Sequence, residues 1–309
     1  MYYQIEANQL VGTIFFGVNL MAFGEPVAFW HQRRTQVAQL SDLLTVAAER
    51  LEELSTPDQI RHTNKVTRLS RVILYRYICD VSMCITNYAT FPFQTGKLAA
   101  NLPFLTDYST YFWIACALQT YIEVTGSIAF GTMLSCHTET SLLLKCLFDT
   151  LGQHLQTAGS HEDIAVSIDV HQRLLEASAQ MQHLFSRSWF SLMIVAVSVL
   201  TVNTYIIIVA GLAQPVYACL VVTILLVFLA PCYLSDMVST AFENVGLAAY
   251  RNNWERKPPD MHRNLVLIIL RSQRKFFFKA GMFGDLNMPK YQAILKNWYT
   301  LAQALIKTG

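Results

Sequence analysis

Six stretches of the chain, each about twenty residues long, are nearly free of charged side chains, and they constrain its fold more than any other feature. A helix of about twenty apolar residues crosses the hydrocarbon core of a bilayer, which is about 30 Å thick. Charged residues make up 14% of the whole chain, against roughly 25% in soluble domains. The stretches are 9–30, 70–92, 109–136, 189–212, 216–234 and 288–306. The sequence therefore predicts an all-α membrane protein with six visible spans.

The basic residues between the predicted spans lie almost entirely on one side of the membrane. The links 32–71, 137–188 and 235–287 hold most of the Lys and Arg, whereas the remaining links and both ends hold Lys97 and Lys307 alone. Lys and Arg near span ends are retained on the cytoplasmic side. We therefore expect these three links in the cytoplasm and both ends of the chain outside.

An external N-terminus of eight residues without a signal peptide is unusual for a protein of this kind. A further span before the first would bring the N-terminus back into the cytoplasm. We therefore expect seven spans in total, of which the first is missing from this chain.

The link 137–188 is long and carries two apolar stripes at helical spacing. The first consists of Leu143, Leu147, Leu151 and Leu155, and the second of Leu174, Leu175, Met181 and Leu184. Gly159 and Ser160 interrupt the pattern and predict a turn between two antiparallel cytoplasmic helices. Such stripes must be buried against partners, which are either other helices of the same chain or a neighbouring subunit.

No pattern in the sequence indicates catalysis. The seven cysteines all lie in predicted spans or on the cytoplasmic side, so they predict neither a disulfide framework nor a metal site. They fit small buried apolar residues. We expect neither an enzyme nor a bound cofactor or metal, and no contact with nucleic acid.

Four motifs follow one another near the C-terminus. They are Y-x-x-x-W at Tyr250 and Trp254, an L-x-R-x-Q-like segment at Leu270, Arg271 and Gln273, the tripeptide Lys279-Ala280-Gly281, and a terminal apolar segment that carries Tyr299. In this order and spacing, at the end of a polytopic membrane protein, they resemble the C-terminal signature of insect odorant receptors. The resemblance implies an inverted-topology helical bundle with seven spans, six of them visible here.

The resemblance also implies a function. Insect odorant receptors are ligand-gated, non-selective cation channels of olfactory neurons, and this chain would be a tuning subunit that binds a volatile small-molecule odorant. We expect a heterotetramer with the co-receptor subunit, embedded in the lipid of the plasma membrane of sensory dendrites. Residues 1–136 would form the outer odorant pocket, 137–188 a cytoplasmic extension, 189–234 two spans, 235–287 the cytoplasmic anchor helices and 288–309 the pore-lining helix.

The family's odorant pocket lies in the outer leaflet, among helices that correspond to the first, second, third and fifth spans here. These spans are rich in aromatic residues and carry a few polar groups, as mostly apolar ligand pockets do. The predicted pocket residues are Phe16, Asn87, Tyr88, Phe91, Phe112, Cys116, Gln119, Thr120 and Thr223. The aromatic residues also fit a belt at the membrane boundary.

Three charged residues within the spans are functional candidates, because charge at membrane depth is costly. Arg76 and Asp80 lie four residues apart and favour a structural pair on one helix face. Glu123 either packs against hydroxyl groups of neighbouring helices or faces a water-filled vestibule.

The last span carries a polar face made of Lys296, Tyr299 and Gln303, with Leu295 and Ala302 beside it. A polar face on a membrane helix should meet protein or water instead of lipid. The resemblance implies that this helix lines the pore and that Tyr299 lies at a gate-forming position. Because a positive charge in the pore would oppose cations, we expect Lys296 near the cytoplasmic mouth or turned away.

The segment 261–279 predicts a basic amphipathic helix beside the membrane. Such a helix can lie on anionic lipid, but the L-x-R-x-Q-like segment favours a cytoplasmic anchor that packs against the helix ending at Trp254. The predicted anchor residues are Tyr250, Trp254, Leu270, Arg271 and Gln273.

Three other classes of protein match the sequence less well. A G-protein-coupled receptor would carry a D-R-Y-like motif after the third span and N-P-x-x-Y in the last, whereas this chain has Ser135-Cys136-His137 and Asn297-Trp298-Tyr299. A secondary transporter would show internal repeats, and we find none. A gustatory receptor of the same superfamily is the closest alternative to an odorant receptor.

Overall fold

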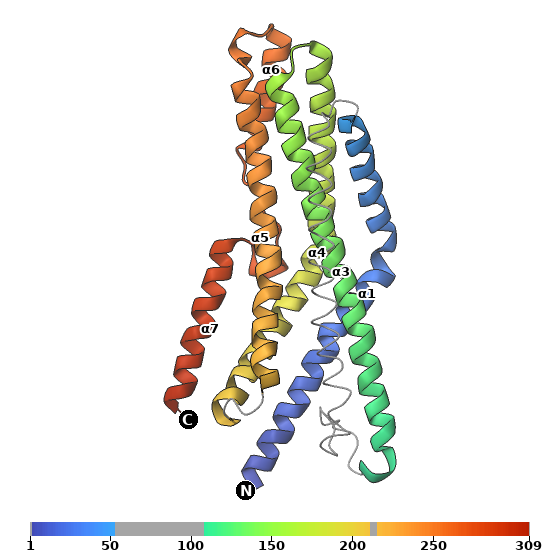
Figure 1. Ribbon diagram of the computed structural model, residues 1–309, viewed down its shortest axis with the longest axis vertical. Coiled ribbons are helices and arrows are strands. Elements are labelled where there is room, and N and C mark those ends of the chain that lie inside the picture. Colours follow the sequence, from blue (N-terminus) through green and yellow to red (C-terminus); the bar gives the residue numbers. More distant parts are fainter. Residues whose placement is uncertain (1, 53–107, 211–214, 309) are drawn as a thin grey trace.

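The protein forms an elongated bundle of long helices, seen in the computed structural model (Figure 1). The structure describes residues 2–52, 108–210 and 215–308. Its helices are α1 (Tyr2–Glu52), α3 (Tyr108–Thr157), α4 (His161–Ala210), α5 (Pro215–Arg251), α6 (Pro259–Ser272) and α7 (Met288–Thr308), with short 3-10 helices η2 (Trp254–Arg256) and η3 (Gly281–Phe283). Over these residues the only β pairing is an isolated bridge between Lys279 and Asp285. The predicted all-α membrane fold is confirmed.

Helices α3, α4 and α5 run without a break from the predicted membrane spans into the predicted cytoplasmic region. α3 and α4 contain 50 residues each, which at 1.5 Å per residue makes each about 75 Å long. This is more than twice the thickness of a hydrocarbon core, about 30 Å. The predicted boundaries between spans and cytoplasmic links, 136/137, 188/189 and 234/235, fall inside these continuous helices. The same three helices therefore form both the predicted membrane region and the predicted cytoplasmic region.

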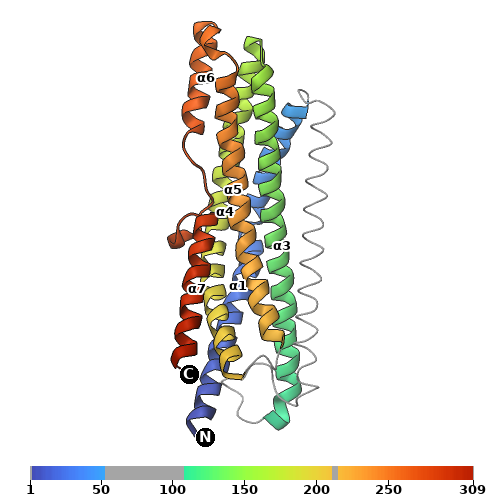
Figure 2. The ribbon, with the colours of Figure 1, turned by 60° about the vertical axis from the view of Figure 1, so that its left-hand side comes forward.

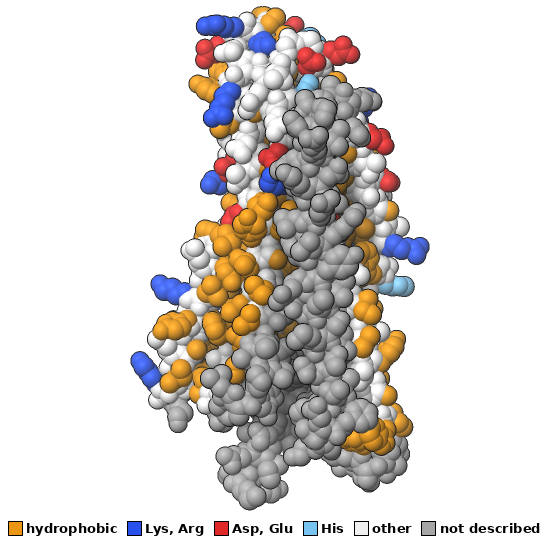
Figure 3. Space-filling view, viewed as in Figure 1, with side chains coloured by type: hydrophobic (Ala, Val, Ile, Leu, Met, Phe, Trp, Pro, Cys, Tyr) orange, Lys and Arg blue, Asp and Glu red, His pale blue; other side chains and the backbone are white. Residues whose placement is uncertain are grey.

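Two helical segments of the described chain are long and apolar enough to cross a bilayer, His161–Tyr205 in α4 and Ile224–Arg251 in α5. They overlap the predicted spans 189–212 and 216–234. In Figure 3 hydrophobic side chains gather on the half of the molecule that carries α7, whereas charged side chains gather toward the end with α6. α1 begins and α7 ends at the apolar end of the bundle (Figures 1 and 2). The two halves thus suit lipid and water respectively.

The predicted turn at Gly159 and Ser160 is confirmed, since α3 ends at Thr157 and α4 begins at His161. The backbone N–H groups of Gly159 and Ser160 donate to the Asp163 carboxylate at 3.2 and 3.0 Å, and the N–H of Asp163 donates to Ser160 Oγ at 3.0 Å. These bonds lower the pKa of Asp163, because they favour its charged form. This capping box fixes where α4 starts.

Most residues of both predicted leucine stripes are buried inside the chain itself. Leu151 and Leu155 on α3 and Leu174 and Met181 on α4 are each 0% exposed, whereas Leu143 and Leu175 are half-buried. The buried residues belong to one core cluster that also includes residues of α1, α5 and α6. The intramolecular bundle therefore accounts for the greater part of both stripes.

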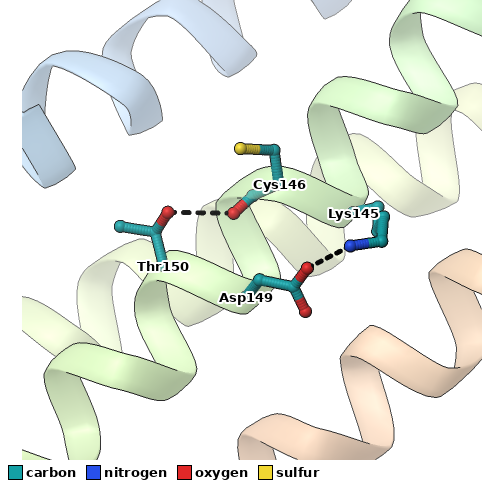
Figure 4. Close-up of polar contacts among 4 residues, drawn as sticks. All are labelled: Lys145, Cys146, Asp149 and Thr150. Carbon is teal, nitrogen blue, oxygen red and sulfur yellow. Dashed lines mark hydrogen bonds and ion pairs between the residues drawn. The ribbon is translucent and has the colours of Figure 1, made fainter. Parts of the chain in front are cut away.

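The surface of α3 shows how the cytoplasmic half separates polar from apolar contacts (Figure 4). Lys145 and Asp149 form an ion pair one helical turn apart, while the Thr150 hydroxyl donates to the carbonyl of Cys146 at 3.0 Å. The buried Cys146 side chain points toward α1 instead. Cys146 thus packs as a small apolar residue, as expected.

The prediction of one basic helix over 261–279 is wrong at its C-terminal end. α6 ends at Ser272, and residues 273–287 form an irregular linker that leads to α7. The reason is tertiary, because burial of Phe278 at 2% exposure and a hydrogen bond from its N–H to Ser235 Oγ on α5 require extended chain here. Gly281 and Gly284, both at positive φ, then turn the chain toward α7.

Helix α5 also ends earlier than predicted, at Arg251 instead of Trp254. Asn253 adopts a left-handed conformation with φ 49°, which terminates the helix. The side chain of Asn252 donates to the carbonyl of Leu155 and, at 3.0 Å, to that of Ala158. The end of α5 therefore satisfies the free carbonyls at the end of α3.

Candidate odorant pocket, linker and pore helix

Most of the predicted pocket residues fall where the structure describes no side chain. Asn87, Tyr88 and Phe91 lie outside the described residues, as do Arg76 and Asp80. The backbone places Phe16 on α1, Cys116, Gln119 and Glu123 on α3, and Thr223 on α5, but their side chains are outside the described set. The role of these residues in ligand binding stays a prediction.

Phe112 and Thr120 are the two predicted pocket residues whose side chains are described. Both lie on α3 and are half-buried. Phe112 makes an edge contact with Trp113, with ring centroids 5.2 Å apart, and Trp113 is 60% exposed. Trp113 thus fits the aromatic belt at the membrane boundary, whereas Phe112 is turned further into the protein.

Sequence reasoning missed Asn203, a polar residue of the fourth predicted span. Its side chain on α4 is 0% exposed, and neither its Nδ2 nor its Oδ1 has a hydrogen-bond partner within the described chain. Its neighbour Thr204 differs, because its hydroxyl donates to the Leu200 carbonyl and accepts from Trp298 Nε1. A lone Asn in an apolar run carries no periodic signal, so only its burial reveals it.

α7 packs one face against α4 and α5 and leaves the opposite face uncovered within the single chain. Trp298 Nε1 donates to Thr204 Oγ1 on α4 at 2.8 Å, and Tyr291 and Ile294 pack against the core. Leu295 and Ala302 are half-buried at the flank of this packed face. The predicted pore residues thus form two groups, one half-buried beside the packed face and one exposed.

The exposed group consists of Lys296, Tyr299 and Gln303. Tyr299 is 60% exposed, and the Gln303 amide donates to its hydroxyl at 2.8 Å. The polar face predicted from spacing therefore exists and points away from α4 and α5. Lys296 lies on this face about 12 Å from the start of α7, at 1.5 Å per residue.

The linker 273–287 is fastened to α4 and α5 immediately before α7 begins. The N–H of Lys279 donates to Gln182 Oε1 at 2.7 Å, and Gln182 Nε2 donates back to the Lys279 carbonyl at 3.4 Å. The N–H of Gly281 donates to Ser186 Oγ at 3.2 Å, and that of Met288 to Asp236 Oδ2 at 2.8 Å. These bonds join the chain immediately before and at the start of α7 to both α4 and α5.

Steric constraints explain the small residues of the tripeptide Lys279-Ala280-Gly281. Ala280 is 0% exposed, which leaves no room for a larger side chain. Gly281 has φ 49°, and a Cβ at this position would lie 3.0 Å from the Phe190 side chain. The small residues let the linker press against α4.

A buried aromatic cluster lies beneath the linker where the predicted spans meet the cytoplasmic extension. The ring of His137 on α3 contacts those of Phe185, Trp189 and Phe278, with centroids 4.9, 5.1 and 5.3 Å apart. Trp189 Nε1 donates to His137 Nδ1 at 3.5 Å. Phe278 belongs to the linker, so this cluster joins it to α3 and α4.

Among the predicted anchor residues, Trp254 is half-buried and the other four side chains are exposed. Tyr250 and Trp254 have ring centroids 6.1 Å apart, and Trp254 contacts His262 of α6 edge-on at 4.7 Å. Tyr250 and Leu270 are each 55% exposed. α6 packs on α5 through Leu265 and Ile268. Leu270 and Leu267, which is 58% exposed, form an apolar surface on the outer side of α6.

Relatives of the chain are found among both characterised proteins and solved structures. It is 24% identical over 224 residues to Odorant receptor 47b of Drosophila melanogaster, which covers 69% of this chain and 53% of that protein. It is 24% identical over 164 residues, 51% of this chain and 42% of the relative, to Putative odorant receptor 69a, isoform A, of the same species. The chain thus spans about half the length of these relatives.

Among solved structures, the insect olfactory receptor OR5 from Machilis hrabei matches the fold with a TM-score of 0.75 at 14% identity, covering 97% of this chain and 88% of that one. The same receptor in complex with eugenol matches with a TM-score of 0.71. The family model described as 7tm Odorant receptor matches residues 8–299. Because that match takes in nearly the whole chain, the protein belongs to the insect odorant receptor family.

Proposed function

We propose that the protein is a tuning subunit of an odorant-gated, non-selective cation channel. The observation that carries this proposal is the exposed polar face of α7, with Tyr299 and Gln303 joined by a hydrogen bond of 2.8 Å. In hydrocarbon such groups would lack partners, which is costly. Several copies of this helix around an axis would place these groups against water and form an ion pathway.

The ligand of the proposed channel is a volatile small molecule bound between the outer halves of the helices. The relative from Machilis hrabei was solved with eugenol, which supports a ligand of this kind. Its contacts would come from the predicted set on α1, α3 and α5, of which Phe112 and Thr120 are half-buried on α3. To gate, the ligand must bind the open state more tightly than the closed one.

The linker supplies a route from ligand to pore. Ligand binding that shifts α4 or α5 would pull on Lys279 and Met288 through Gln182 and Asp236. The start of α7 would then move, while Trp298 keeps the helix in contact with α4 through its bond of 2.8 Å to Thr204. Open and closed arrangements of this linker would form the bistable element that gating needs.

The proposal includes a heterotetramer with the co-receptor subunit in the plasma membrane of sensory dendrites. Most of the leucine stripe residues of α3 and α4 are already buried in the chain, so other residues would form the larger part of the assembly surface. The apolar outer side of α6, with Leu267 58% and Leu270 55% exposed, supports contact between neighbouring subunits at the end of the bundle that carries α6.

Current recording in excised membrane patches tests the function. Cells would express this chain with and without the co-receptor, and odorants would be applied to patches bathed in solution without nucleotides. We expect odorant-evoked cation current in the co-expressing patches, because the ligand itself opens the pore. A current that appears only when GTP is supplied would show G-protein coupling and contradict the proposal.

A further inference from the structure

We infer that Asn203 is the polar contact for an oxygen-bearing ligand held in the outer half of the helical bundle. The inference rests on the proposed function, because it names the ligand class of that odorant pocket, and it adds α4 to the helices that form it. Asn203 is 0% exposed, and both polar atoms of its side chain lack partners within the described chain. Buried amides are rarely left in this state without a ligand or a water molecule.

Asn203 differs from the hydroxyl residues near it on α4. Ser198, Thr201 and Thr204 donate their hydroxyl hydrogens to carbonyl groups one turn earlier, at 2.9, 2.8 and 2.7 Å. A carboxamide cannot satisfy both its donors and its acceptor in this way. Among the described residues with a buried, unpartnered polar side-chain atom, Asn203 is also the one that has two. A side chain with separate donor and acceptor groups that are both unmet is therefore found at this position alone among the described residues.

The position of Asn203 along α4 places it beyond the middle of the membrane. It lies about four helical turns, or roughly 21 Å, past Trp189, the first residue of the predicted span. The hydrocarbon core is about 30 Å thick. Asn203 thus belongs to the outer half, the level at which the odorant pocket is proposed.

The direction of Asn203 is set by helical periodicity. It follows Phe185 by about five full turns, so both residues lie on one face of α4. Phe185 stacks on Phe29 of α1 with centroids 5.2 Å apart and contacts His137 of α3 at 4.9 Å. Thr204, on the adjacent face, is the residue that meets α7. Asn203 therefore lies on the same face of α4 as Phe185, whose ring contacts are with α1 and α3, the helices of Phe16, Phe112 and Thr120.

The chemistry of the amide selects the ligand. Nδ2 can donate and Oδ1 can accept, so a hydroxyl group satisfies both, a carbonyl or ether oxygen satisfies the donor, and a hydrocarbon satisfies neither. A water molecule would need two or more polar partners, and the Thr204 hydroxyl beside it is already used. The structure assigns this subsite to small alcohols or phenols with an apolar body.

The first test uses the purified full-length protein without ligand. Asn203→Leu keeps the shape of the side chain but removes its polar atoms, and Thr201→Val is the matched control on the same helix. Because no group of the described chain bonds to the Asn203 amide, the melting temperature of the protein should not fall in Asn203→Leu. A clear drop, with Thr201→Val unchanged, would show that the protein itself holds the amide and would overturn the inference.

The second test measures binding by the thermal shift of the same proteins with matched probes. Octanol, methyl heptyl ether and nonane are similar in size, and eugenol and its methyl ether contain the same substituted ring. Within each set only octanol and eugenol carry a hydroxyl group. The wild type should bind octanol and eugenol about five- to tenfold more tightly than the corresponding ethers, the effect of one buried hydrogen bond. It should bind nonane more weakly still, because a hydrocarbon makes neither bond. Asn203→Leu should lose this preference and Thr201→Val should keep it. A preference that is absent from the wild type or survives in Asn203→Leu contradicts the subsite.

Current recordings separate this inference from the proposed channel. If the hydroxyl preference depends on Asn203 but no probe opens a current in the presence of the co-receptor, the subsite stands and the channel proposal fails. If odorants open currents in Asn203→Leu with unchanged rank order, the channel stands and the subsite is wrong.

Discussion

The side chain of Gln182 on α4 and the backbone of Lys279 in the linker form a reciprocal pair. The Lys279 N–H donates to Gln182 Oε1 at 2.7 Å, and Gln182 Nε2 donates to the Lys279 carbonyl at 3.4 Å. This pair joins residues 97 positions apart in the sequence. It connects a membrane-crossing helix to the segment that positions α7, which makes it a mechanical link between the proposed pocket and the proposed pore.

Replacing Gln182 with Ala should weaken gating without weakening odorant binding. The change removes both hydrogen bonds, each worth about 1 kcal/mol, so the open–closed equilibrium should shift by up to about thirtyfold and the maximal odorant-evoked current should fall accordingly. Binding measured by thermal shift should stay at the wild-type level. Gln180→Ala is the matched control, because Gln180 bonds only to Glu176 on its own helix, at 3.5 Å. Equal effects of the two substitutions would show that the linker pair has no special role.

Replacing Gly281 with Ala should destabilise the linker. The new Cβ would lie 3.0 Å from the Phe190 side chain, on a backbone with φ 49°, and such strain costs about 1–3 kcal/mol. The free energy of unfolding should fall by that amount in a denaturant titration. In the double variant with Phe190→Ala, the loss of stability should be smaller than the sum of the losses in the two single variants. Gly159→Ala, at an open position, should be neutral, and failure of the rescue would mean that the contact with Phe190 is not the cause.

The cytoplasmic bundle should lose stability in mild acid because of His171. This residue is 4% exposed and stacks on Phe242 with centroids 6.0 Å apart. Burial, together with the nearby charge of Arg271, lowers the pKa of His171 from 6.5 to about 4. The unfolded chain therefore takes up a proton at higher pH than the folded one. Stability should be complete above pH 6.5 and fall by roughly 3 kcal/mol as the pH approaches 4.

The measurement for His171 is the melting temperature as a function of pH. His171→Phe should flatten the decrease in this range, because Phe can stack on Phe242 without taking up a proton. His183→Phe, at an exposed site of the same helix, should leave the curve unchanged. An identical acid sensitivity in wild type and His171→Phe would place the responsible group elsewhere.

Local signals in the sequence predicted the long elements well. The described part of the apolar run 189–212 lies in α4, the run 216–234 lies in α5, and the break at Gly159 and Ser160 is the observed turn. The polar face of α7 also follows from spacing alone, since Tyr299 and Gln303 lie one turn apart and bond to each other. Such features depend on periodicity and on helix-breaking residues, which are properties of nearby residues.

The linker and the buried amide could not be predicted in the same way. Phe276, Phe277 and Phe278 extend the apolar pattern of α6, but contacts of Phe278 with Ser235 and His137 pull the chain out of the helix. Gln182 and Ser186 look like ordinary surface residues of α4 until the linker docks on them. Asn203 stands out only once its burial and its lack of partners are known. Each depends on residues distant in sequence.

State-dependent access to position 299 tests the central claim, that odorant binding opens a pore lined by α7. Tyr299→Cys, Gln303→Cys and the control Ile294→Cys would be co-expressed with the co-receptor and treated with a water-soluble thiol reagent, with and without odorant. Tyr299 is 60% exposed, whereas Ile294 packs against the core. The account predicts that the Tyr299→Cys and Gln303→Cys proteins react faster when odorant is present, with an altered current, and that Ile294→Cys does not react. Equal rates with and without odorant, with no effect on conductance, would show that α7 does not line the pore.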